Sequence, residues 1–168
     1  QLIGTFVTSG SGQLSNPSGL AFGPDGNLYV ASHSTNRVNR YNGATGAFMD
    51  AYLPTGTVGM DYPADVTFGA DGNLYVTNRW ADSVSRYVGP LGASPGSPLP
   101  ASGQSGATFV AAGSAGLDSP LQLTFGPDGH LYVGSNNSSN QVMRFNASTG
   151  AFIDAFGDSL SDSRGLAF

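Results

Sequence analysis

One stretch of sequence occurs three times and decides the fold. Residues 20–30 read LAFGPDGNLYV, residues 66–76 read VTFGADGNLYV and residues 123–133 read LTFGPDGHLYV, with seven of the eleven columns identical in all copies. Residues 165–168 read GLAF, which matches the start of a fourth copy. The phenylalanines that mark the copies are 46, 57 and 43 residues apart: Phe22, Phe68, Phe125 and Phe168. A period of about 40 to 50 residues is typical of propeller blades.

Each copy predicts four short antiparallel strands. In the first copy, the Gly-Pro-Asp-Gly of residues 23–26 is a turn signal, and residues 27–30 alternate as a strand should. Third strands are predicted at 37–41, 83–87 and 141–145, and fourth strands at 47–50, 108–111 and 151–154. Four such strands joined by turns make one propeller blade, so we expect an all-β chain with three complete blades.

The blades are predicted at about 19–52, 65–112 and 122–156. The greater length of the middle one comes from residues 89–106, which are rich in Pro, Gly and Ser and predict an exposed, mobile insertion. The alternative, a domain boundary, is less attractive because the blade pattern resumes at Thr108. Residues 3–7 match a fourth strand, so partial strands are expected at both ends.

Three blades do not close a ring, because propellers have about four to eight. We expect the chain to be part of a larger, six-bladed ring that further blades of a longer chain complete. Self-association of two copies is the alternative.

Composition excludes several classes of protein. The chain has 168 residues, and its six cations are all Arg and its eleven anions all Asp, with no Lys, Glu or Cys. Without these helix formers a helical bundle is excluded. The absence of a long apolar run excludes a membrane-spanning helix. A net charge of −5 without clustered cations argues against nucleic acid as a partner.

The motif PSGLAFGPDGNLYVAS at 17–32, followed by NRVNRY at 36–41, resembles the NHL-repeat family of β-propellers. It is also similar to gluconolactonase-like and virginiamycin B lyase-like propellers. The resemblance covers nearly the whole chain apart from the insertion. It implies a propeller fold, and the family includes protein-binding modules as well as lactonases and lyases.

Residues that recur in every copy are interpreted as scaffold. The repeated Phe and Tyr residues are expected to pack in the core or between blades. Arg40, Arg86 and Arg144 recur at one position of the third strand, and two of them are predicted to face Asp50 and Asp154 across a hairpin. The second blade has no such Asp.

Residues that differ between blades point instead to a ligand site. The loops after the second strands and before the first strands should meet at one mouth of the central channel, with Asp61-Tyr62 and Asp118 just before two of the first strands. The candidate ligand-binding residues are His33, Asp65, Asn78, Arg79, Trp80, Gln122 and Asn136. Arg79 and Trp80 stand out because a planar cation beside a large amphipathic ring suits recognition. The alternative is that all of these are solvated loop residues.

A metal site is the weaker interpretation of the same residues. Asp65, Asn78 and Asn136 offer oxygen ligands suited to Ca²⁺. Gluconolactonase-like propellers hold a divalent ion in the channel, as a rule with a Glu, and this chain has none. We therefore expect no cofactor, with Ca²⁺ as the alternative.

No catalytic set is recognisable. The Gly-x-Ser-x-Gly match at 92–96 lies in the Pro-rich insertion without the strand-to-helix turn that a nucleophile needs. We therefore expect a non-enzymatic, NHL-type binding or scaffolding module, with a protein, carbohydrate or small-molecule ligand at the channel mouth. The alternative is a lactonase-like hydrolase or lyase with a divalent cation in the channel. The polar, Lys-free surface suggests an extracellular or periplasmic location.

Overall fold

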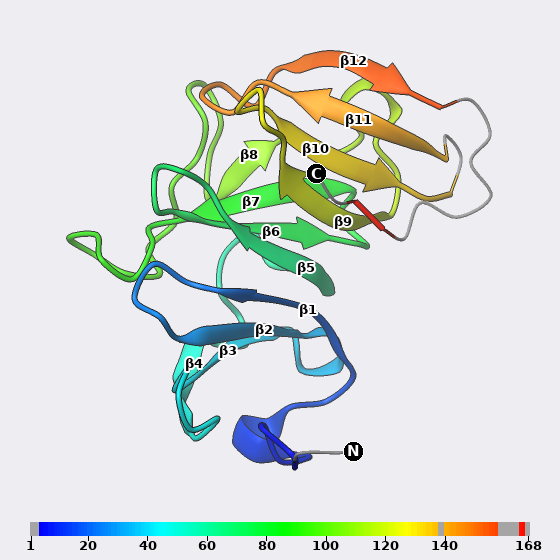
Figure 1. Ribbon diagram of the computed structural model, residues 1–168. Helices are drawn as coiled ribbons and strands as arrows, with labels where there is room; N and C mark the ends of the chain where they lie inside the picture. The colour runs from blue at the N-terminus through cyan, green and yellow to red at the C-terminus, as the bar shows by residue number, and fades with distance from the viewer. Residues whose placement is uncertain (1–3, 138–139, 158–164, 167–168) are drawn as a thin grey trace.

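The computed structural model describes residues 4–137, 140–157 and 165–166, and its strands form three antiparallel four-stranded sheets (Figure 1). Within each sheet the strands follow chain order, and no α-helix occurs among the described residues. The first blade consists of β1 (Pro17–Phe22), β2 (Leu28–Ser32), β3 (Arg37–Tyr41) and β4 (Phe48–Leu53). The second consists of β5 (Pro63–Phe68), β6 (Leu74–Asn78), β7 (Ser83–Tyr87) and β8 (Thr108–Val110). The third consists of β9 (Pro120–Phe125), β10 (Leu131–Ser135), β11 (Gln141–Phe145) and β12 (Phe152–Phe156). The predicted all-β fold with three blades is confirmed.

The repeated motif forms the hairpin between the first two strands of each blade. In the first blade, Gly26 has a φ of 75°, a left-handed conformation that glycine adopts at little cost. Asp25 accepts hydrogen bonds from the backbone N–H of Asn27 at 3.2 Å and from the hydroxyl of Tyr29 at 3.0 Å. The Asp–Tyr bond recurs in the other two blades. The residues that are identical in all copies therefore form one kind of turn, in which the Asp accepts hydrogen bonds from the strand that follows the turn.

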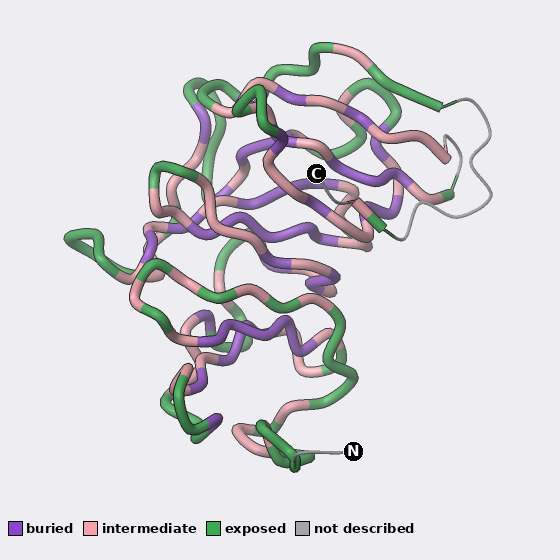
Figure 2. Tube along the Cα trace, in the orientation of Figure 1, coloured by how far each residue is buried: buried purple, intermediate pink, exposed green. Residues whose placement is uncertain are grey.

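The blades pack through the repeated aromatic residues. β1 lies beside β5 and β5 beside β9, so the three first strands are neighbours (Figure 1). Phe68 of the second blade packs edge-on against Tyr29 of the first, with ring centroids 4.9 Å apart. Phe125 of the third packs in the same way on Tyr75 of the second, at 5.0 Å. Buried residues accordingly follow the middle strands of each sheet (Figure 2).

The predicted Arg–Asp pairs form across two of the hairpins. Arg40 donates to Asp50 and Arg144 to Asp154, with shortest N–O distances of 2.5 and 2.6 Å. In the second blade, Arg86 instead donates to the backbone carbonyls of Leu99 and Pro100, at 2.9 and 3.0 Å. Two main-chain acceptors thus replace the missing carboxylate.

The insertion at 89–106 is only partly the exposed loop that its composition predicts. Leu91 is 72% exposed, whereas Ala101 is buried at 3%. Tyr87 pairs with Pro98 in a β-bridge, and the hydroxyl of Tyr52 from the first blade donates to the carbonyl of Val88 at 2.6 Å. Within the segment, the N–H of Leu99 donates to the carbonyl of Arg86 in β7, and the N–H of Gly96 donates to the hydroxyl of Tyr52 in the first blade. These bonds hold the segment, which composition alone does not reveal.

The outer strand predicted at 3–7 is wrong for the residues that are described, because residues 4–7 form no strand. A strand needs a neighbour's backbone groups, and no strand of the described chain pairs with this segment. Val7 instead packs against the cluster of Leu28, Val30 and Tyr41. The inner strand expected at 165–168 lies largely outside the described residues, and residues 165–166 form no strand.

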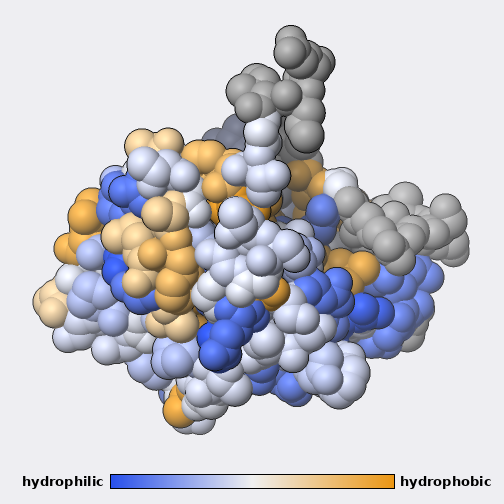
Figure 3. All heavy atoms as spheres, turned by 90° about the horizontal axis from the view of Figure 1, so that it is seen from below, coloured by the Kyte–Doolittle hydropathy of each residue, from blue (hydrophilic) through white to orange (hydrophobic). Residues whose placement is uncertain are grey.

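The outermost blades leave apolar side chains at the surface. Phe22 and Leu20 of β1 are 58% and 62% exposed, although the equivalent Phe68 and Phe125 are packed against a preceding blade. Figure 3 looks from below, the side on which Figure 1 places the first sheet, and shows hydrophobic residues there. No helix of the described chain is long and apolar enough to cross a membrane.

Candidate functional site

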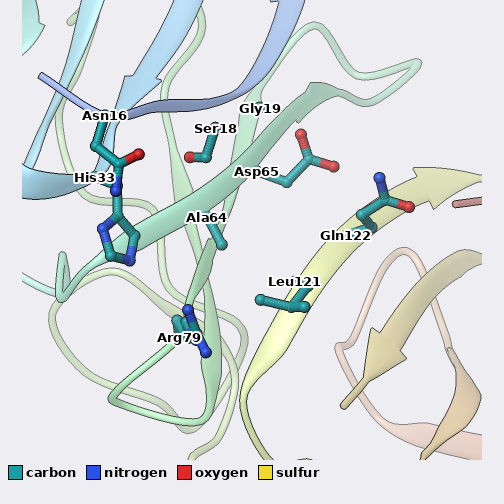
Figure 4. Close-up of a pocket in the computed structure, with 9 residues that line it drawn as sticks. All are labelled: Asn16, Ser18, Gly19, His33, Ala64, Asp65, Arg79, Leu121 and Gln122. Atoms are coloured by element: carbon teal, nitrogen blue, oxygen red, sulfur yellow. The ribbon is translucent and has the colours of Figure 1, made fainter. Parts of the chain in front are cut away.

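A cavity of about 410 Å³ lies where the first strands of the three blades meet. β1, β5 and β9 each contribute to its wall, together with the loops that precede β1 and follow β2 and β6 (Figure 4). Four of the residues predicted from the sequence line it: His33, Asp65, Arg79 and Gln122. This space is called the channel cavity below.

Asp65 connects all three blades. Its Oδ1 accepts from the backbone N–H of Val66 at 2.9 Å, and its Oδ2 accepts from that of Leu123 in the third blade at 3.2 Å. On its other side it touches Gly19 so closely that a Cβ on that glycine would lie 1.9 Å from Oδ1. Burial, partly offset by the two backbone hydrogen bonds, raises the pKa of Asp65 to about 6.

Two polar atoms on the wall of the channel cavity are buried without a hydrogen-bond partner among the described residues. They are Nε2 of His33 and Oε1 of Gln122. Burial and the charge of Arg79 lower the pKa of His33, so its imidazole is neutral at neutral pH. An unpaired buried polar atom costs on the order of 1–3 kcal/mol, a cost that a bound ligand or water removes.

Arg79 and Trp80 follow β6 at the rim of the channel cavity. Nε of Arg79 donates to the hydroxyl of Ser119 at 3.2 Å, which holds the guanidinium between the second and third blades. The indole of Trp80 is 63% exposed and lies stacked on Tyr62, with centroids 3.6 Å apart. Tyr62 in turn contacts His33 edge-on at 4.8 Å, so the aromatic groups form one continuous row.

Asn78 and Asn136 do not line the channel cavity. Asn78 is fully buried; its Oδ1 accepts from the backbone N–H of Asp61, and its Nδ2 donates to Ser83 and Ser85. These bonds turn the side chain into its own blade. The backbone N–H of Asn136 donates to the carbonyl of Asp118, and its side-chain Oδ1 is buried without a partner among the described residues.

The described residues do not fit a divalent cation in the channel. No three His, Asp, Glu or Cys side chains in that part of the chain lie close enough to hold a metal. Both oxygens of Asp65 already accept backbone N–H groups, and the oxygen of Asn78 accepts another. Ca²⁺ takes six to eight oxygen ligands, and this set falls well short.

Several residues of the wall were not singled out from the sequence. Asn16, Ser18 and Leu121 line the channel cavity, and Ser119 anchors Arg79. All four lie at or just before the start of a first strand. These residues could be found by aligning the segments that precede the three copies as well as the copies themselves.

No protein-family model matches the sequence, and no curated protein matches it either. Solved structures do resemble the chain. A streptogramin B lyase is 24% identical over 89% of this chain and 43% of its own, with a TM-score of 0.56. The hydrazine synthase of Kuenenia stuttgartiensis is 19% identical over 98% and 41%, with a TM-score of 0.66.

A structure of a nidogen/laminin complex gives a third match, 20% identical over 85% of this chain and 48% of that one, with a TM-score of 0.61. The chain thus spans less than half of each of these three structures. At such identities the likeness shows the propeller fold alone. The neighbours include both a lyase and a binding complex, so the fold does not choose between the two functions.

Proposed function

We propose that the chain is a non-enzymatic, NHL-type binding or scaffolding module whose ligand lies in the channel cavity. The observation that carries the proposal is the pair of buried, unpartnered atoms, Nε2 of His33 and Oε1 of Gln122, whose side chains line this cavity from opposite sides (Figure 4). They come from different blades, and packing alone gives no reason to leave both without partners. A ligand that donates a hydrogen bond to Oε1 of Gln122, and that offers Nε2 of His33 a donor or an acceptor according to the tautomer of the imidazole, removes the cost.

The rest of the wall supports a polar ligand. Asp65 and Arg79 place an acceptor and a cationic donor beside the two unpartnered atoms. Asp65 accepts one backbone N–H from Val66 of its own blade and one from Leu123 of the third blade, which suits a rigid binding wall. The set of ligands that fits is a small polar molecule, a sugar or a polar side chain of a protein partner.

An enzyme remains the second candidate, because of one observation. A carboxyl group with a pKa of about 6, in a cavity that a histidine also lines, is the kind of group that catalysis uses as a general base. If Asp65 is the general base of a lactonase-like hydrolase or lyase, the protein should turn over a sugar lactone, and Asp65→Asn should abolish this turnover. Turnover insensitive to a chelator would make this enzyme independent of a metal.

The binding proposal is tested by thermal unfolding in the presence of a library of small polar compounds. A compound at 100 times its dissociation constant stabilises the fold by about 2.7 kcal/mol, enough to raise Tm by several degrees. We expect such shifts for the wild type and for Gln104→Leu, a control at an exposed position of the insertion. Gln122→Leu should lose them. Shifts that persist in Gln122→Leu, or that never occur, contradict a ligand in the channel cavity.

We also propose that further blades cover the two outer faces and complete a ring. Phe22 lacks the Tyr of a preceding blade on which Phe68 and Phe125 pack. The composition of the surface supports an extracellular or periplasmic location.

A further inference from the structure

A second cavity, also of about 410 Å³, opens between the loops of the second and third blades. It shares Arg79 with the channel cavity and otherwise has its own wall. The residues that line it are Arg79, Trp80, Asp82, Asp118, Ser119 and Asn137. We call this space the rim cavity.

Trp80 gives the rim cavity a flat, rigid aromatic wall. Its ring is within 17° of parallel to that of Tyr62, which covers one face of the indole and leaves 63% of the residue exposed. The backbone of Tyr62 is itself held at a φ of 51°, and its N–H donates to Oδ1 of Asn36 at 3.2 Å. The indole is therefore fixed in position before any ligand arrives, which lowers the entropy cost of binding.

Polar groups of both hydrogen-bonding types surround the indole. Asp82 accepts from the backbone N–H of Ser119 at 2.7 Å, and Asp118 accepts from the side chain of Asn137 at 3.2 Å. These bonds orient the carboxylates, and a carboxylate accepts up to about four hydrogen bonds. Arg79 also lines the rim cavity and is held through its Nε, so the ends of its guanidinium remain donors.

The charges restrict the class of ligand. A phosphate or other anion meets two carboxylates, and an organic cation meets the guanidinium of Arg79. A wholly apolar ligand leaves the polar wall without partners, at a cost for each buried group. What fits is a neutral ring with one apolar face for the indole and hydroxyl groups around its edge.

We propose that the rim cavity is a carbohydrate site, in which the apolar face of a neutral pyranose lies on Trp80 and its hydroxyl groups bond with Asp82, Asp118 and Arg79. The site goes beyond the proposed function, because it does not depend on any ligand being bound in the channel cavity. Trp80 is the binding platform, and Tyr62 is a positioning residue that acts through it.

The chain provides its own reporter for this site, because Trp80 is its one tryptophan. The experiment titrates the protein with neutral oligosaccharides of glucose, galactose, mannose and N-acetylglucosamine, and follows tryptophan fluorescence. We expect a saturable change with at least one series. Calorimetry then measures affinity in variants, with Trp80→Ala weakening it at least tenfold and Trp80→Phe retaining part of it.

Two controls separate this site from unfolding and from the channel cavity. Leu91→Ala removes an equally exposed apolar side chain on the insertion and should leave the affinity unchanged. Gln122→Leu alters only the channel cavity and should also leave it unchanged. The proposal is overturned if no oligosaccharide changes the fluorescence, or if affinity survives Trp80→Ala. It is overturned as well if glucose 6-phosphate or choline binds at this tryptophan in place of the neutral sugars.

Discussion

Asp65 holds the wall of the channel cavity together, because it contacts residues of all three blades. Its folded-state pKa, about 6, lies above its ordinary value of 3.8 because burial disfavours the charged form. The folded chain therefore binds this proton more tightly than the unfolded chain does. The contribution of Asp65 to stability is fully present below about pH 4 and is lost as the pH rises through 6.

The comparison of wild type with Asp65→Asn isolates this titration, because the asparagine does not titrate. We expect the stability of the wild type relative to the variant to fall by roughly 2 kcal/mol between pH 4 and pH 7. Chemical denaturation at a series of pH values measures it, and the ¹³C shift of the Asp65 carboxyl gives the midpoint directly. A midpoint near 4 contradicts the buried placement of this group.

Gly19 is required because of its closeness to Asp65. A Cβ there lies 1.9 Å from the Asp65 carboxylate and 2.5 Å from its Cα, and the backbone atom cannot move aside cheaply. Gly19→Ala should destabilise the fold by about 1–3 kcal/mol, measured as a lower denaturation midpoint. Gly165→Ala is the matched control, because Gly165 occupies the same repeat position and no described residue lies within 4 Å of a Cβ placed there. Equal effects of the two substitutions are the result that counts against this packing.

At the scale of the strand and hairpin, the three recurring arginines have different partners. Arg40 and Arg144 pair with carboxylates at the protein surface, where water and salt screen such pairs and they contribute little to stability. Arg86 donates to two carbonyls of the insertion, and its guanidinium also lies 4.6 Å from the centre of the Phe109 ring. Only a planar, forked donor makes these contacts together.

Arg86→Lys should therefore loosen the insertion although the charge is kept. We expect faster amide hydrogen exchange in the second half of 89–106, above all at Leu99 and Ala101, whose N–H groups donate to the carbonyls of Arg86 and Thr108. Arg144→Lys is the control, and should leave exchange in the insertion as it was. Unchanged exchange in Arg86→Lys means that the arginine does not hold the segment.

At this scale the sequence predicts the features that depend on residues close together in the chain. The turn of residues 23–26 and the alternation of the strands depend on neighbouring residues, so the hairpins and the order of their strands could be predicted. The Arg40–Asp50 pair was found because the two residues face each other across one hairpin. The carbonyl partners of Arg86 could not be predicted, because every residue has a backbone carbonyl and the sequence does not distinguish one from another.

The candidate site was predicted less completely, since it depends on which way each side chain turns. Asn78 and Arg79 are adjacent in sequence, yet one is buried in its own blade and the other lines the channel cavity. A shift of register between Pro63 and Asp65, beside Asn78, disturbs the regular alternation at this point. The seating of Trp80 on Tyr62 likewise comes from the packing of two loops.

At the scale of the whole molecule, the outer faces have an expected behaviour. Phe22 is exposed on the outer face of the first blade. At the two interfaces between blades, its equivalents Phe68 and Phe125 each pack on a tyrosine of the preceding blade. In isolation the 168-residue chain should therefore self-associate as its concentration rises. Phe22→Asp should reduce this in sedimentation experiments, and Leu91→Asp, on the insertion, should not. Sedimentation that is equal for wild type and Phe22→Asp contradicts the assignment of this face as an interface.

The three blades matter together because the channel cavity takes residues from all of them. The most direct test of a ligand there is a set of crystal structures of the chain, each soaked with one small polar compound. The proposed function predicts compounds bound between His33 and Gln122 that form a hydrogen bond with Nε2 of His33 or donate one to Oε1 of Gln122. Compounds that bind elsewhere on the molecule and leave this cavity to solvent would contradict it.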